Sequence, residues 1–249
     1  DVTENLQGIE SATEVAANIR AEIFRQTGLT ASAGVSYNKF LAKLGSGYQK
    51  PNGQTVIRPG RGAEIVADLD VSRFHGIGPA TAAKMAELGI RTGLDLRNQS
   101  LEFLTRMFRK SGGYYYAIAR GEDDRPVRPD RERKSYGGEN TFEHDTTDRA
   151  VLLTELNAIA DKLWEHRERI GKDGRTVTLK AKFADFEQIT RSRTIDKPVD
   201  DRRLLTSIYE DLLDGIIPLE QPLRLIGLTI SNLIDVNARK PSDQLSLDI

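Results

Sequence analysis

The chain has 249 residues, and its 36 Lys and Arg nearly balance its 37 Asp and Glu, so the formal net charge is −1 at pH 7. The absence of cysteine excludes disulfides and thiolate metal sites and is compatible with a reducing cytoplasm. No apolar run approaches the ~20 residues of a membrane span and no secretory signal is visible, so we expect a cytoplasmic protein without membrane contact.

Residues 1–59 predict alternating helices and strands. Ser11 and Glu14 form the pattern of a capping box and Gly28 suits a C-terminal cap, which predicts a helix over 11–27. The next expected elements are a strand over 29–35, a helix over about 38–48 and a strand over 54–57. This alternation is typical of an α/β layer, and such a layer needs more strands than these residues supply. Since the first residue is Asp1 and not Met, we expect the chain to be part of a longer protein.

Residues 60–120 predict a small all-α region. Its expected short helices cover about 62–69, 79–88, 93–98, 100–108 and 112–120. Within it, the stretch FHGIGPATAAKMAELGI (74–90) fits a helix-hairpin-helix, in which Phe74 and Ile77 anchor the turn in the core.

The glycines of that turn, Gly76 and Gly78, free backbone N–H groups for a nucleic-acid phosphate, and Lys84 can add a salt-sensitive contact. A dinucleotide-binding turn fits poorly, because Thr81 stands where the third glycine belongs and no strand precedes. A plain αα-hairpin with a glycine-rich turn remains the alternative.

The segment GEDDRPVRPDRERKS (121–135) predicts a linker, because it combines two prolines, dense charge and almost no apolar residue. A solvated linker and a strand that follows a phosphate backbone both remain open.

Residues 136–234 predict the element order βαββαβ, which is typical of a four-stranded sheet with two helices on one face. The expected elements are strands over about 136–143, 176–183, 186–195 and 223–234 and helices over about 148–170 and 201–214, with Asp173-Gly174 as a hairpin-like turn.

The face of this sheet away from the helices predicts a phosphate-binding platform. Lys180 and Lys182 alternate with apolar residues, and Arg191 and Arg193 share a face of the next strand, so we expect a sheet with helices behind it and Lys and Arg in front. An ordinary solvated face is the alternative.

The sequence shows no clear pattern of catalytic or metal-binding residues. His75, His144 and His166 share no metal-ligand spacing, and the Asp123-Asp124 and Asp200-Asp201 pairs suit capping or solvation better than metal binding. From the residues alone, the chain is a nucleic-acid backbone binder without its own catalytic centre. Its polar end, 235–249, finishes in QLSLDI, which is either a frayed terminus or a short docking peptide.

Four segments of the chain resemble the Y-family translesion DNA polymerases of the DNA polymerase IV type. They are SYNKFLAKLGSGYQKPNGQTVI (36–57), HGIGPATAAKMAELGIRT (75–92), RERKSYGGENTF (131–142) and QLSLDI (244–249). The resemblance implies a multi-domain α+β fold. Its parts are the C-terminal part of an α/β palm (1–59), an all-α helix-hairpin-helix thumb (60–122), a basic linker (123–134), a βαββαβ little-finger domain (135–234) and a clamp-binding tail (235–249).

The resemblance also implies roles for individual residues. Lys50 matches a lysine that contacts the incoming triphosphate. The implied DNA-backbone contacts are Gly76 and Gly78 of the hairpin, Lys110 and Gly112 of a second thumb turn, and Lys134, Ser135, Arg191 and Arg193 of the little finger. Gln244, Leu245 and Leu247 match anchors of a sliding-clamp-binding peptide.

The implied activity is that of an error-prone lesion-bypass DNA-directed DNA polymerase, a monomer that binds primer–template DNA, dNTP and the sliding clamp. The metal-binding carboxylates of this family lie upstream of the position that matches Asp1. We therefore expect Mg²⁺ only in the complete enzyme, and this chain alone to bind no metal and to be inactive. A non-catalytic helix-hairpin-helix module of a DNA repair scaffold is the alternative function.

Overall fold

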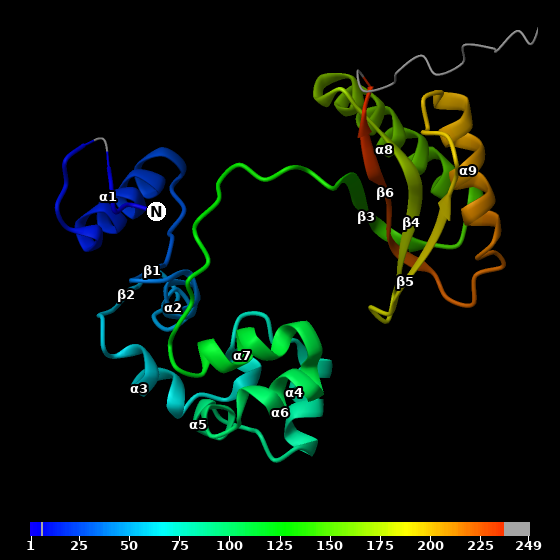
Figure 1. Cartoon of the computed structure of the whole chain (residues 1–249). Coiled ribbons are helices and arrows are strands. Elements are labelled where there is room, and N and C mark those ends of the chain that lie inside the picture. Colours follow the sequence, from blue (N-terminus) through cyan, green and yellow to red (C-terminus); the bar gives the residue numbers. More distant parts are fainter. Residues whose placement is uncertain (6, 237–249) are drawn as a thin grey trace, which may run out of the picture. The chain divides into compact units, whose positions relative to one another are not determined.

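The computed structural model describes residues 1–5 and 7–236, which fall into two compact units that divide after Pro129 (Figure 1). Among these residues, no helix is both long enough and apolar enough to cross a membrane.

The first unit begins with two helices and a two-stranded parallel sheet. These elements are α1 (Ala12–Thr27), β1 (Ala33–Ser36), α2 (Lys39–Gly45) and β2 (Gln54–Ile57). Of the predicted capping box of α1, the bond from the Glu14 amide to the Ser11 side chain is present, and the predicted C-terminal cap is confirmed, since Gly28 is left-handed with φ 70°. The predicted strand from Leu29 is wrong in its start, because β1 can pair only alongside the four residues of β2, and Leu29 is 68% exposed.

The predicted all-α region is confirmed. It consists of α3 (Gly62–Ala67), the 3₁₀ turn η1 (Val71–Arg73), α4 (Pro79–Glu87), α5 (Gly93–Arg97), α6 (Leu101–Phe108), the 3₁₀ turn η2 (Arg109–Ser111) and α7 (Gly112–Ile118). Its core is continuous with α2: the Phe40 ring lies 5.4 Å from the Phe74 ring, and both side chains are buried. Residues 122–134 then form no helix or strand, as the linker prediction requires.

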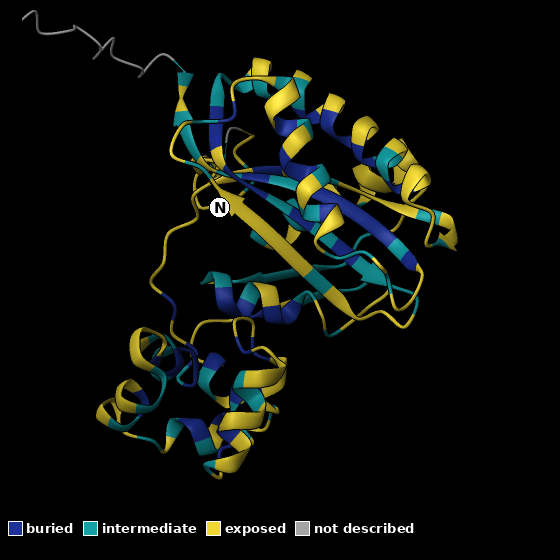
Figure 2. Ribbon diagram, turned by 90° about the vertical axis from the view of Figure 1, so that its right-hand side faces the viewer, coloured by how far each residue is buried: buried dark blue, intermediate teal, exposed yellow. Residues whose placement is uncertain are grey.

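The second unit has the predicted order βαββαβ. Its elements are β3 (Ser135–Thr146), α8 (Arg149–Ile170), β4 (Lys172–Phe183), β5 (Gln188–Thr194), α9 (Arg202–Asp214) and β6 (Leu223–Asp235). The strands form one antiparallel sheet in the order β3-β6-β4-β5. Both helices cover one face, where Leu156 and Ile208 belong to the same core as Leu179 and Leu228. Figure 2 shows exposed residues on the outer sides of these helices.

The prediction of a turn at Asp173-Gly174 is wrong. The chain turns at the left-handed Gly171, which caps α8, and β4 starts at the next residue. Asp173 is buried and pairs with Arg167. A Cβ at Gly174 would lie 2.6 Å from the Ser231 carbonyl oxygen, so this glycine permits β6 to approach closely.

We expect Gly174→Ala to lower the free energy of unfolding of the second unit by about 1–3 kcal/mol, because the added methyl group forces the two strands apart. Urea denaturation followed by the fluorescence of Trp164 measures the change. Gly215→Ala is the matched control, since its Cβ would be 3.4 Å from the nearest atom, Asp211 O, at φ −70°. Equal losses in the two variants would contradict the close-approach argument.

Candidate nucleic-acid interface

The glycine hairpin, residues 74–79, joins η1 to α4 as the sequence predicts. Phe74 and Ile77 are buried in the core, at 1% and 6% exposure, and the residues around them face solvent. Gly76 has φ +97°, a conformation that few residues other than glycine adopt. Gly78 is the N-cap of α4 with no side-chain cap, and Pro79 follows at the first helical position. The first-turn amides of this nine-residue helix are thus open to an acceptor from outside.

Tyr114 of α7 holds the glycine hairpin in place. Its hydroxyl donates to the His75 carbonyl oxygen at 2.7 Å, and its ring lies 2.9 Å from where a Cβ of residue 76 would stand. A glycine is therefore needed at position 76 for space as well as for φ. Burial raises the pKa of the Tyr114 hydroxyl, so it is a hydrogen-bond donor at neutral pH.

Asp123 and Arg125 connect this support to α2. The Arg125 guanidinium lies 4.4 Å from the centre of the Tyr114 ring and donates to both oxygens of Asp123 at 2.6 and 2.8 Å. The Asp123 carboxylate, 1% exposed, also accepts from the Phe40 amide at 3.1 Å. These bonds to Arg125 hold the pKa of Asp123 below its ordinary value. The sequence predicted capping or solvation for this carboxylate, and it did not indicate that the capped residue lies 83 positions away.

Of the remaining predicted thumb residues, Lys84 and Gly112 have partners within the protein. Lys84 is exposed, and it donates to the Met107 carbonyl oxygen at 2.7 Å, which ties α4 to the end of α6. Its ammonium group also lies 5.2 Å from the centre of the Phe108 ring. Gly112 is buried, and its amide donates to Arg109 O. A Cβ at Gly112 would lie 2.5 Å from the Leu104 carbonyl, so this glycine serves the packing of α7 on α6. Lys110 is exposed in the same turn.

The side of the sheet without helices, which we call the open face, is rich in hydroxyl groups. Directly opposite residues of antiparallel strands project to one face, so the register defines its rows. These rows are Ser135–Ser231–Thr176–Thr194, Gly137–Thr229–Thr178–Ser192, Glu139–Gly227–Lys180–Thr190 and Thr141–Leu225–Lys182–Gln188. The predicted Lys180 and Lys182 lie here, as does Ser135, with exposed Lys134 immediately before β3. Sequence reasoning missed the hydroxyl rows, because they exist only after the strands pair.

The prediction that Arg191 and Arg193 lie in front of the sheet is wrong. They pair with Leu179 and Val177, which face the helices, so both arginines project to the helix side of the edge strand β5. Arg193 accordingly donates to Asp211 of α9 at 2.6 Å. Arg191 is exposed and donates to the neighbouring Thr190 carbonyl oxygen at 3.1 Å.

Lys50 stands exposed in the turn between α2 and β2. It makes no hydrogen bond or ion pair with residues 1–5 or 7–236. Arg20 of α1 holds this turn, donating to the Asn52 carbonyl at 2.6 Å and to its side chain at 2.8 Å. Arg20 therefore positions Lys50, although no local pattern of the sequence links the two.

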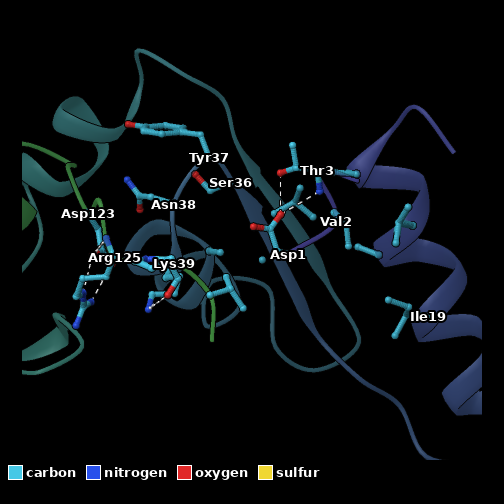
Figure 3. Close-up of a pocket in the computed structure, with 18 of the residues that line it drawn as sticks. Asp1, Val2, Thr3, Ile19, Ser36, Tyr37, Asn38, Lys39, Asp123 and Arg125 are labelled. Atoms are coloured by element: carbon cyan, nitrogen blue, oxygen red, sulfur yellow. Dashed lines mark hydrogen bonds and ion pairs between the residues drawn. The ribbon is translucent and has the colours of Figure 1, made fainter. Parts of the chain in front are cut away.

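The described residues do not fit a divalent-metal centre. A cavity of about 700 Å³ lies among Asp1–Thr3, α1, β1 and residues 123–127 (Figure 3). Its Asp1 carboxylate accepts from the Thr3 amide and hydroxyl, and Asp123 is bound by Arg125. Within the described ranges, no three His, Cys, Asp or Glu residues form a group that could hold a metal ion. Gln244, Leu245 and Leu247 lie outside the described residues.

Comparisons with known proteins cover nearly the whole chain. Family models match residues 1–47 ("impB/mucB/samB family"), 59–90 ("IMS family HHH motif") and 133–247 ("impB/mucB/samB family C-terminal domain"). "DNA polymerase IV 2" of Agrobacterium fabrum is 50% identical over 249 residues, which are 100% of this chain and 70% of that protein. "DNA polymerase IV 3" of Mesorhizobium japonicum is 53% identical over 247 residues, or 99% of this chain and 67% of that protein.

Solved structures agree with these matches. A Y-family DNA polymerase chimera of Dbh and Dpo4 has a TM-score of 0.72 at 26% identity, covering 94% of this chain and 68% of the chimera. The insertion ternary complex of Dbh DNA polymerase has a TM-score of 0.53, with 26% identity and the same coverage.

The Asp123 carboxylate gives a pH-dependent prediction. We expect Asp123→Asn to lower the free energy of unfolding of the first unit by about 1–3 kcal/mol at pH 7, because buried donors lose a charged acceptor. The folded-state pKa of Asp123 is depressed, so its contribution is present above about pH 3.9 and disappears as the pH falls further. The two proteins should therefore converge in stability in acid, which denaturation followed by circular dichroism tests. The exposed neighbour in Asp124→Asn is the control, and an equal loss there would refute the assignment.

Proposed function

Because the chain belongs to the impB/mucB/samB family of Y-family translesion DNA polymerases, we propose that it grips primer–template DNA by the sugar-phosphate backbone during lesion bypass. In this proposal residues 1–59 are the end of the palm, 60–122 the thumb, 123–134 the linker and 135–234 the little finger. The glycine hairpin, with the uncapped and exposed start of α4, is the observation that carries the proposal.

The thumb holds one stretch of the backbone through the hairpin amides. Backbone N–H groups and the positive end of a helix bind phosphate without reading the base sequence. Tyr114 and Arg125 keep these amides in place before DNA arrives, so little ordering entropy is lost on binding. Lys84 adds positive charge beside the glycine hairpin, and Lys110 adds positive charge at the second thumb turn.

The little finger uses its open face. Hydroxyl groups donate hydrogen bonds to phosphate oxygens, and glycines at positions 137 and 227 let a strand of DNA approach the sheet closely. Lys182 supplies positive charge on this side, the exposed Lys134 adds charge immediately before β3, and Arg191 reaches the DNA from the edge of β5. Base stacking is not part of this grip, because the open-face rows contain no aromatic residue.

Nucleotide binding and catalysis depend on different parts of the complete enzyme. Lys50 contacts the triphosphate of the incoming dNTP as a point charge. The divalent ions of the complete enzyme, Mg²⁺ by our proposal, supply charge neutralisation at the transferred phosphate. By this proposal the 249 residues alone bind DNA without extending a primer.

The proposal also includes one further partner, the sliding clamp, and a monomeric state. Residues 244–249, through Gln244, Leu245 and Leu247, bind the sliding clamp, and the protein works as a cytoplasmic monomer. A non-catalytic repair scaffold has less support, because the family models match residues 1–47 and 133–247 as well as the hairpin.

The open face gives a test of DNA binding. We expect Lys182→Glu to weaken binding of a primer–template duplex about tenfold, since it places a negative charge against the backbone, and to reduce the salt slope by about 1–2. Fluorescence anisotropy between 50 and 200 mM salt measures both. Arg203→Glu changes the charge equally on the exposed side of α9, and we expect less than a twofold effect. Equal weakening by both variants would contradict binding by the open face.

Lys50 gives a test of nucleotide binding. In the complete polymerase, we expect Lys50→Ala to raise the KM for dNTP about tenfold, the loss of one phosphate contact of about 1.4 kcal/mol, while duplex affinity is retained. Single-nucleotide incorporation kinetics measures the change. Lys43→Ala removes another exposed lysine, from α2, and serves as control. Unchanged kinetics in Lys50→Ala would rule out the triphosphate contact.

A further inference from the structure

A groove runs along the free edge of the little-finger sheet, between β3 and α8. It encloses a cavity of about 360 Å³. Ile159 and Leu163 of α8 form its apolar floor, and residues 136–140 of β3 form one wall. It lies between the edge of β3 and α8, and two of the residues that line it, Gly137 and Glu139, also belong to the open-face rows.

The wall of the groove is an unpaired strand edge. β3 pairs with β6 on one side and, in the part of the chain that the structure describes, with no strand on the other (Figure 1). Its outward N–H and C=O groups can therefore accept another extended chain. Gly137 and Gly138 carry no side chain that would obstruct this approach.

One end of the groove has positive charge without a counterion. Nη1 of Arg133 lies 2.7 Å from Nε2 of His166, and Nη2 of Arg169 lies 3.2 Å from Nδ1 of the same ring. A neutral imidazole has only one acceptor nitrogen, so the ring can satisfy only one of these guanidinium groups. No carboxylate of residues 1–5 or 7–236 forms an ion pair with Arg133 or Arg169.

Other charged groups make the two ends of the groove different. Lys162 lies one helical turn before His166 and adds a third positive charge. Glu139 is already paired with Lys180 on the open face, and Glu155 stands almost two turns beyond Lys162, toward the opposite end. The groove thus has a cationic end, an apolar floor and one acidic group at the far end.

We propose that the β3 groove binds an extended acidic segment of a partner protein, which adds to the sheet as a strand beside β3 and places a carboxylate between Arg133 and Arg169. Strand addition explains the free edge beside an apolar floor, since backbone hydrogen bonds supply affinity and alternate side chains enter the groove. The carboxylate supplies the acceptors that the two guanidinium groups lack. A nucleic-acid strand would satisfy the charge but not the strand edge or the floor.

The test uses the ¹⁵N-labelled full chain and two blocked hexapeptides, Ac-EEVTVT-NH₂ and Ac-QQVTVT-NH₂. We expect the acidic peptide to shift the amide resonances of β3 and of the second half of α8, and to bind at least tenfold more tightly than the neutral peptide. Arg133→Gln combined with Arg169→Gln should reduce the affinity for the acidic peptide to that for the neutral one. Both side chains are exposed, so the double variant should fold, which circular dichroism verifies.

A matched control replaces two exposed cations elsewhere in the same unit, Lys197→Gln with Arg203→Gln, and should leave peptide binding unchanged. The proposal is overturned if the two peptides bind equally, if neither binds at about 2 mM, or if both double variants weaken binding to the same extent. Displacement of the acidic peptide from these amides by a dT oligonucleotide would assign the groove to nucleic acid and would equally overturn it.

Discussion

The first unit depends on a junction between the start of α2 and the residues that follow α7. Residues 37–40 and 121–126 meet there through hydrogen bonds that span more than 80 residues. The buried Asp123 carboxylate is its centre, because it caps α2 through the Phe40 amide and binds Arg125 at the same time. Helices α3 to α7 lie between the two segments of this junction, and their core continues into α2.

The junction reaches the glycine hairpin through two side chains. Arg125 lies on the Tyr114 ring, and Tyr114 holds the hairpin by a hydrogen bond and by contact at Gly76. The amides proposed to hold DNA phosphate are therefore supported by residues from three separate parts of the sequence, which are α2, α7 and the segment that follows α7. The second unit is organised differently. One face of its sheet covers the core, and the other face carries hydroxyl groups, glycines and lysines.

Local signals explain where sequence reasoning succeeded. The short helices of residues 60–120 begin at side chains that accept backbone N–H groups, such as Thr92 and Ser100, and such caps are legible in a few consecutive residues. The alternation of Val177, Leu179 and Ala181 likewise identified β4 and its buried face. The Asp173-Gly174 dipeptide is typical of turns, but here the helix cap at Gly171, two residues earlier, has already reversed the chain, and both residues lie in β4.

The sequence by itself determined the kinds of element, the order βαββαβ, the anchoring of the glycine hairpin by Phe74 and Ile77, and the family to which the chain belongs. The elements, their order and the anchors of the hairpin follow from periodicity, caps and turn residues, which act over a few neighbouring residues. The family follows from the resemblance of whole motifs. Only the tertiary structure decided that Arg191 and Arg193 turn toward the helices, that Tyr114 supports Gly76, and that Arg133 and Arg169 meet at one histidine. Each of these depends on register or on contacts between distant segments, and a single sequence contains no local signal for which residue will lie opposite which.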